Sequence, residues 1–231
     1  MASDSAFDTV MRLGFAGRGI AYLVAGLALL AAGQATDPAQ LLNGLGEAWT
    51  GRGGLLLVGF GLFGYGVLGW TSSMLRLDGP VIRLSRFVSG VLHAAVALYA
   101  IFLAAGGVNA AERLISHLSG DGRIATAIGG LLAAAGLWQL AVVWHASFLR
   151  HLLPAARRAP WLAWGGRAAY LGRGFAFMLG GLFLWNVHIA GPEETLRATG
   201  GELNLTALGL ILFGLFSLIE AAYARLGPAE G

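Results

Sequence analysis

The chain has 231 residues, of which 57% are hydrophobic and only 12% are charged, and its mean hydropathy is +0.71. Soluble globular domains carry about 25% charged residues, so this composition excludes a water-soluble protein with an ordinary charged surface. The net charge of +3 comes from arginine, because the chain has no lysine, and it favours contact with anionic lipid over nucleic acid. The absence of cysteine excludes disulfides, thiol catalysis and iron–sulfur ligation.

Six apolar stretches are each long enough to cross a bilayer core of about 30 Å as a helix. In chain order they run from Leu13 to Gly33, Gly54 to Leu75, Leu84 to Gly106, Ile124 to Leu149, Ala163 to Ile189 and Leu203 to Ala224. All six prolines fall between or after these stretches, where no helical hydrogen bond is lost. We therefore predict an all-helical integral membrane protein with six unbroken transmembrane helices in a single membrane domain, residues 1–231.

The stretches pair into three consecutive two-helix repeats, which we place at residues 12–76, 83–151 and 167–226. The segment from Arg12 to Leu27 matches the segment from Arg167 to Leu182 without a gap, and both contain Gly-Arg-Gly. Each repeat crosses the membrane twice, so all three have the same orientation. Parallel repeats of this kind predict a pseudo-threefold bundle about the membrane normal.

Glycine placement supports the repeats and predicts close helix packing. A glycine followed by leucine and an aromatic residue recurs in the second, fourth and sixth stretches, at Gly61, Gly136 and Gly214. Small residues at fourfold spacing follow Gly17 and Gly172, as in helix interfaces of membrane proteins. We expect these small-residue faces to pack inside the bundle, with contact to a partner subunit as the alternative.

The loop inside each repeat begins with a helix-start signal. A cap residue is followed three positions later by Gln or Glu at Asp37, Asn109 and Gly191. We predict a short interfacial helix in each of these outer loops.

Arginine placement predicts the orientation of the chain. Eleven of the fifteen arginines flank one face of the predicted bundle. The excess of positive charge on cytoplasmic loops places this face, and with it both chain termini, in the cytoplasm.

An arginine motif opens two of the three repeats. It reads Phe15-Ala16-Gly17-Arg18-Gly19 in the first and Tyr170-Leu171-Gly172-Arg173-Gly174 in the third, whereas the middle repeat has Val88-Ser89-Gly90 and lacks the arginine. In this motif and in its repeats the chain resembles, over nearly its whole length, a family of bacterial six-span membrane proteins whose domain has no known function. The resemblance implies a six-helix fold in the bacterial inner membrane and no particular activity.

Four polar residues inside the apolar stretches are candidates for a lipid-binding site, an anion site or an ion pair. Arg18 and Arg173 each have three alternative roles: interfacial anchoring by snorkelling, a specific lipid or anion site, or an internal ion pair. Glu220 needs a partner, because an isolated carboxylate at the helix centre costs about 2.5–3.5 kcal/mol on insertion scales. Two roles are open for Glu220: a salt bridge with one of these arginines, or a place in a proton or cation path. Gln139 is a candidate for an interhelical hydrogen bond.

The histidines raise a haem or quinone site, for which His93 and His145 are the candidate ligands. Their expected depths differ by about 7 Å at a helical rise of 1.5 Å per residue, which disfavours shared ligation. No metal-binding spacing, catalytic constellation or nucleotide loop is recognisable in the sequence.

The sequence therefore favours a non-enzymatic membrane protein without a cofactor. We expect a scaffold, a lipid-associated factor or an accessory subunit of a membrane complex, with membrane lipids and a membrane protein or a second copy of the chain as partners. The alternatives are a small-solute or proton-linked transporter that uses Glu220 and the arginines, and a haem- or quinone-binding subunit.

Overall fold

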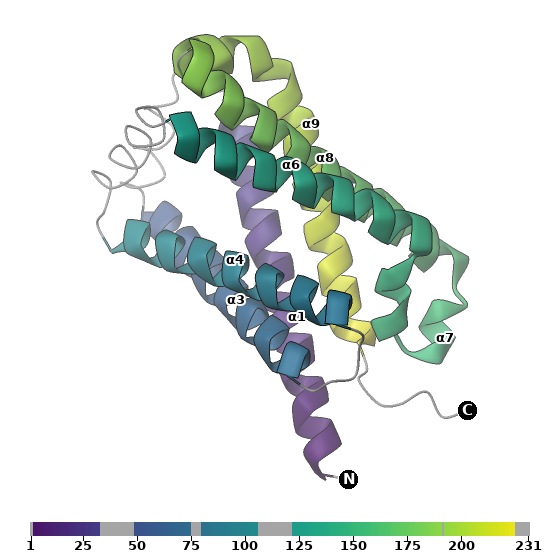
Figure 1. Ribbon diagram of the computed structural model, residues 1–231. Helices are drawn as coiled ribbons and strands as arrows, with labels where there is room; N and C mark the ends of the chain where they lie inside the picture. The colour runs from purple at the N-terminus through teal and green to yellow at the C-terminus, as the bar shows by residue number, and fades with distance from the viewer. Residues whose placement is uncertain (1, 33–48, 75–79, 106–121, 191, 225–231) are drawn as a thin grey trace.

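The computed structural model describes residues 2–32, 49–74, 80–105, 122–190 and 192–224, and these residues form helices and no strand (Figure 1). The long helices are α1 (Ala2–Ala32), α3 (Trp49–Met74), α4 (Pro80–Ala104), α6 (Gly122–His145), α8 (Pro160–Ala190) and α9 (Pro192–Tyr223). The short helices η1 (Ser147–His151) and α7 (Pro154–Arg157) lie between α6 and α8.

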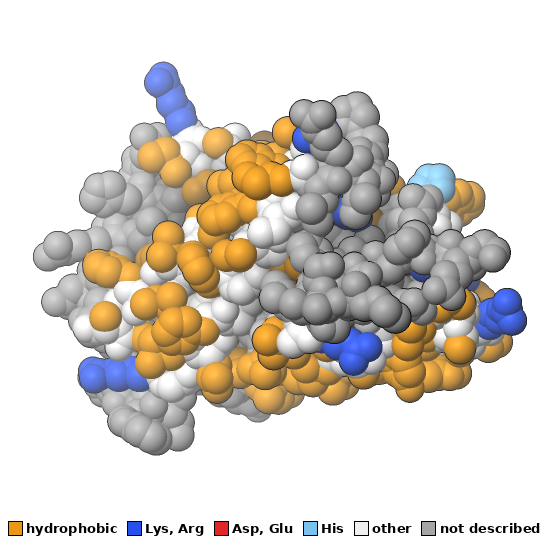
Figure 2. All heavy atoms as spheres, turned by 90° about the horizontal axis from the view of Figure 1, so that it is seen from below, with side chains coloured by type: hydrophobic (Ala, Val, Ile, Leu, Met, Phe, Trp, Pro, Cys, Tyr) orange, Lys and Arg blue, Asp and Glu red, His pale blue; other side chains and the backbone are white. Residues whose placement is uncertain are grey.

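Five of the long helices are long and apolar enough to cross a membrane, namely α1, α3, α6, α8 and α9. In α4 the apolar segment Arg86–Phe102 is shorter. Large apolar side chains such as Phe60, Trp144 and Trp164 are exposed on the outside of the bundle. Figure 2 shows hydrophobic side chains over much of the described surface on one face. These are the features of a multi-pass membrane protein.

Prolines begin helices in this fold. Pro80, Pro154, Pro160 and Pro192 are each the first residue of a helix, where the missing N–H has no helical partner to lose. None of the described apolar helices is interrupted by a proline. The prediction of an unbroken helix from Ile124 to Leu149 is wrong at its end, because α6 stops at His145 and Ala146, with φ 45°, turns the chain.

The outer-loop helices were predicted at three places, and two of these, at Asp37 and Asn109, lie outside the described residues. The third prediction is wrong. Pro192 does begin a helix, but this helix is α9, which continues without a break to Tyr223. The proline and the two glutamates that follow it favour a helix start, and no proline follows before Tyr223 to end the helix.

The long helices pack in the series α4, α3, α1, α9, α8, α6. Each packs along its neighbours in this series, whereas the two ends, α4 and α6, share no extensive contact among the described residues. Figure 1 shows α4 and α6 apart on the same side of the bundle. The start of α1 and the end of α9 lie at one end, where Arg12 Nε donates to the backbone oxygen of Ala224 at 3.4 Å.

Glycine allows the closest helix contacts. A Cβ atom built on Gly17 would lie 2.7 Å from the Cα atom of Gly61, and a Cβ atom on Gly172 would lie 2.7 Å from the Cα atom of Gly209. Both distances are shorter than real side chains accept, so α1–α3 and α8–α9 approach where only glycine fits. The prediction that these faces pack inside the bundle is confirmed.

The connection from α6 to α8 folds back onto the bundle. Ala146, with φ 45°, turns the chain at the end of α6. Phe148 then stacks on Tyr170 with ring centroids 5.2 Å apart. Leu153 N donates to the backbone oxygen of Tyr223 at 2.9 Å, which ties the connection to the end of α9.

Candidate functional site

The most buried charges of the described chain form an ion pair between the first and the last long helix. Arg18 of α1 is 1% exposed and Glu220 of α9 is 2% exposed. An Nη atom of Arg18 contacts Oε2 of Glu220 directly. The salt bridge predicted as one alternative for Glu220 is present, and Arg18 is the arginine that makes it.

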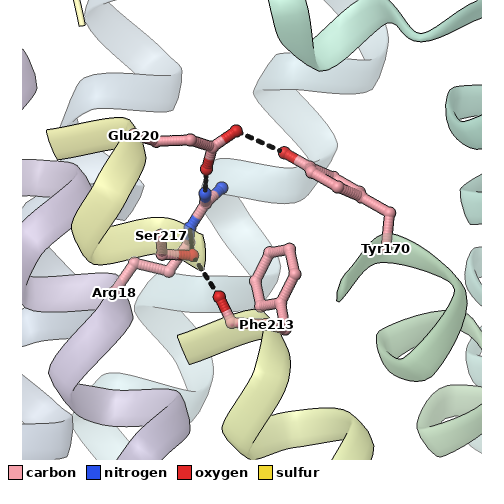
Figure 3. A network of polar contacts seen from close by, with 5 residues as sticks. All are labelled: Arg18, Tyr170, Phe213, Ser217 and Glu220. Atoms are coloured by element: carbon pink, nitrogen blue, oxygen red, sulfur yellow. Dashed lines mark hydrogen bonds and ion pairs between the residues drawn. The ribbon is translucent and has the colours of Figure 1, made fainter. Parts of the chain in front are cut away.

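Two hydroxyl groups complete this polar network, which Figure 3 shows. Arg18 Nε donates to the hydroxyl oxygen of Ser217 at 3.2 Å, and this hydroxyl donates to the backbone oxygen of Phe213 at 2.9 Å. The hydroxyl of Tyr170, on α8, donates to Oε1 of Glu220 at 3.1 Å. Both carboxylate oxygens of Glu220 therefore have a partner, as a buried charge requires.

Aromatic rings enclose the Arg18 guanidinium. Its Cζ atom lies 4.5 Å from the ring centroid of Tyr65 and 4.8 Å from those of Phe15 and Phe213. Guanidinium groups are attracted to ring faces at such distances, and the attraction grows when water is excluded. The interpretation of Arg18 as an interfacial anchor is therefore wrong, because its charge is held inside the bundle.

The second motif arginine, Arg173 of α8, is also interior, with 6% of its surface exposed. Its Cζ atom lies 4.5 Å from the ring centroid of Phe213, 4.8 Å from that of Phe177 and 5.2 Å from that of Tyr22. Phe213 thus contacts both guanidinium groups. Unlike Arg18, Arg173 forms no salt bridge among the described residues, and its Nε atom is buried without a hydrogen-bond partner there.

Gln139 lies on α6 beside the Arg173 segment. A Cβ atom built on Gly174 would lie 3.1 Å from the Cβ atom of Gln139. The Oε1 atom of Gln139 is buried and has no hydrogen-bond partner among the described residues. The interhelical hydrogen bond predicted for Gln139 is therefore not made through this atom.

The two candidate cofactor ligands are in different surroundings. His93 is buried on α4, where Nδ1 contacts the backbone oxygen of Ser89 at 2.6 Å and Nε2 has no partner among the described residues. Its ring lies edge-on to Tyr65, with centroids 4.9 Å apart. His145 is exposed at the end of α6, a helix that shares no extensive contact with α4 among the described residues. The structure does not bring the two histidines together, and the described residues contain no metal-binding cluster.

Sequence reasoning missed most of the surroundings of the charges. Tyr170 was noted only as the aromatic residue of the motif, and Ser217, Phe213 and Tyr65 were not noted at all. Serines and aromatic residues inside apolar helices are common, so a linear sequence gives no signal that separates these four. Their role depends on which faces of α1, α3, α8 and α9 meet.

The fold and this centre define a class, namely a helical multi-pass membrane protein with two arginines in its core. No family model, curated protein or solved structure matches the chain.

Proposed function

We propose that the chain is a six-span protein of the bacterial inner membrane, built from three two-helix repeats, that acts by binding and not by catalysis. Its function would be that of a lipid-associated scaffold or accessory subunit of a membrane complex. This proposal includes α4 as the sixth span and the family resemblance of the arginine motif. It also includes cytoplasmic termini, in line with the arginine excess and with the start of α1 and the end of α9 at one end of the bundle.

Recurring glycine contacts support the repeats. Gly19 of α1 meets Gly214 of α9, with a built Cβ 2.9 Å from the backbone oxygen, and Gly136 of α6 meets Gly174 of α8 at 2.7 Å. The two crossings correspond, since Gly19 and Gly174 each follow the motif arginine. Gly90 of α4 approaches the backbone oxygen of Gly66 of α3 in the same way, at 2.8 Å.

These contacts favour a different register for the first of the proposed repeats. In this register the counterpart of Gly136 and Gly214 is Gly66, five positions after the Gly61 that the sequence signature favours. Glycines are frequent in α3, so the signature alone had several possible registers.

One observation carries the binding function: the charges that chemistry or transport would need are held in place within the core. Glu220 is 2% exposed, its two oxygens are held by Arg18 and Tyr170, and Arg18 is surrounded by rings. A proton or solute path needs a carboxylate that reaches water, so the transporter alternative has less support. The haem or quinone alternative has less support because His93 and His145 lie apart.

Native mass spectrometry of gently extracted protein tests this proposal. We expect the folded chain to retain lipid, or a second protein, through transfer to the gas phase. A bare monomer under every mild extraction condition would overturn the binding function. A visible absorption band in the purified protein would instead favour the cofactor-binding subunit.

A further inference from the structure

The two motif arginines occupy corresponding places but differ in their partners. Arg18 precedes Gly19, which crosses Gly214, and its partners Ser217 and Glu220 lie three and six positions after Gly214. Arg173 precedes Gly174, which crosses Gly136. Three and six positions after Gly136 stand Gln139 and Val142.

Val142 therefore stands where a second glutamate would have to be. It packs against the same hydrophobic cluster that contains Tyr170 and Phe213. Where Arg18 has a hydroxyl and a carboxylate, Arg173 has an amide and a hydrocarbon side chain. The surroundings of Arg173 therefore contain the cation without a carboxylate at the place that corresponds to Glu220.

The buried charges of the described centre do not cancel. Arg18 and Glu220 neutralise each other, and Arg173 leaves one positive charge in a water-poor interior. An unpaired charge at such a place is costly, and a bound anion would remove the cost. Carboxylate and phosphate are the groups that a guanidinium binds best, through paired N–H donors.

Unpartnered polar atoms support a ligand at this place. Arg173 Nε and Gln139 Oε1 are both buried without partners among the described residues, and both side chains are more than nine-tenths buried. His93 Nε2 is a third such atom, but with Nδ1–H donating to the backbone oxygen of Ser89 it is an acceptor and does not pair with an anion. Native proteins rarely leave buried polar atoms unpaired, so an unseen partner is indicated.

The packing order shows from where a partner can enter. The connection from α6 to α8 covers Tyr170, because Phe148 of this connection stacks on the Tyr170 ring and is itself buried. Among the described residues, α4 and α6 are the two ends of the packed series and share no extensive contact; α4 carries His93 and α6 carries Gln139. The exposed faces of α4 and α6 are apolar, with Phe87 and Trp138 among their residues. An occupant that crosses these faces must have apolar chains.

We propose that Arg173 and Gln139 bind the anionic group, a phosphate or carboxylate, of a membrane lipid that enters between α4 and α6. This site deepens the proposed binding function and rests on it. Arg173 supplies the charge and N–H donors. A 180° rotation of the Gln139 amide would place its NH₂ group at the buried position of Oε1, where it donates to the anion.

The test is to supply the missing carboxylate within the chain. In Val142→Glu the new side chain takes the place of the lipid anion, whereas Val142→Gln has nearly the same size without the charge. Each protein is stripped of lipid in neutral detergent, then given phosphatidylglycerol, phosphatidylcholine or inorganic phosphate. Bound lipid is counted by native mass spectrometry, and the thermal midpoint Tm is followed.

We expect phosphatidylglycerol to bind wild type and Val142→Gln better than phosphatidylcholine does. Affinity for phosphatidylglycerol should fall about ten- to a hundredfold in Val142→Glu, the range of one charge-assisted hydrogen-bonded pair. Without lipid, Val142→Glu should have a Tm equal to or above that of wild type, because its carboxylate pairs with Arg173.

Several results would overturn the site. They are equal binding of phosphatidylglycerol by Val142→Glu and wild type, a Val142→Glu protein that fails to fold, and equal stabilisation by inorganic phosphate alone. Lipid that is retained but indifferent to Val142→Glu would remove this site and leave the binding function standing. A wild-type protein that retains nothing would remove both.

Discussion

At the scale of single residues, the two arginines show how the same motif can be used in two ways. The Arg18 charge is paired with Glu220, while the Arg173 charge contacts only aromatic rings among the described residues. Phe213 contacts both guanidinium groups and so keeps two like charges in one core. Ring faces offer partial negative charge without a proton to lose, which suits a site poor in water.

Glu220→Gln is expected to destabilise the fold strongly. The change leaves Arg18 buried without its counter-charge, and breaking a buried pair by removing one partner costs about 3–5 kcal/mol. Thermal unfolding in a mild detergent measures the loss. The double variant Arg18→Met/Glu220→Leu, which removes both charges, should recover much of it.

The matched control for this prediction is Glu202→Gln on the same helix. Glu202 is exposed, and its loss should change stability by no more than about 0.5 kcal/mol. If Glu220→Gln and Glu202→Gln had the same Tm, the ion pair would not be a stabilising feature of the core.

At the scale of the helices, backbone approach at glycine sets the order of packing. Gly17–Gly61 joins α1 to α3 and Gly172–Gly209 joins α8 to α9, whereas Gly19–Gly214 joins the first long helix to the last. Lipid chains are as apolar as leucine, so helices in a membrane gain from dense packing and not from the hydrophobic effect. Small residues at crossings give that density, and they also place Arg18 and Glu220 on facing surfaces.

Gly172→Ala is expected to loosen the contact of α8 with α9. The added Cβ would lie 2.7 Å from the Cα atom of Gly209, so the helices must separate, at a cost of about 1–3 kcal/mol. The loss is measured as a lower Tm in detergent.

Gly165→Ala on the same helix is the control, because a Cβ atom there meets nothing within 4 Å. Alanine favours helix over glycine by up to about 1 kcal/mol, so this variant should be equal to or more stable than wild type. Two variants with the same Tm would show that the glycine crossing does not limit packing.

At the scale of the whole molecule, the packed helices form an open series and not a closed ring. A strict threefold bundle would pack α4 against α6 as α1 packs against α3 and α8 against α9, yet in the described part of the chain α4 and α6 share no extensive contact. Of the three sequence segments compared for the arginine motif, the one in α4 has Ser89 at the place of the arginine. The segment that departs from the motif therefore lies in a helix at one end of the packed series.

Cysteine labelling from the two sides of the membrane is expected to show six crossings. The chain has no cysteine of its own, so single cysteines at Ser3, Asp78, Asn109 and Glu230 each report one position. The variants Ser3→Cys, Asp78→Cys and Glu230→Cys should react with a membrane-impermeant maleimide from the cytoplasmic side. Asn109→Cys should react from the other side. Reaction of Asp78 and Asn109 from one side would show that α4 does not cross, and chain ends on opposite sides would contradict the repeats.

The sequence by itself determined the helical membrane class, the apolar centres of the long helices but not all of their ends, and the need of Glu220 for a partner. Each of these follows from local properties: the length of an apolar stretch, the place of a proline, or the cost of a lone carboxylate among apolar residues. Even so, the sequence did not show that α9 starts as early as Pro192, because its first residues are polar and read as a separate loop helix.

Only the tertiary structure decided which arginine is paired, which rings surround it and where the helix series stays open. Arg18 and Arg173 have nearly the same local sequence, so nothing near them distinguishes the paired residue from the unpaired one. The difference lies about two hundred residues away from Arg18, in Glu220 of α9, and on α6 in Val142. Which helix faces meet is a property of the whole packing. That packing places one motif arginine in an ion pair and leaves the other without a salt bridge among the described residues.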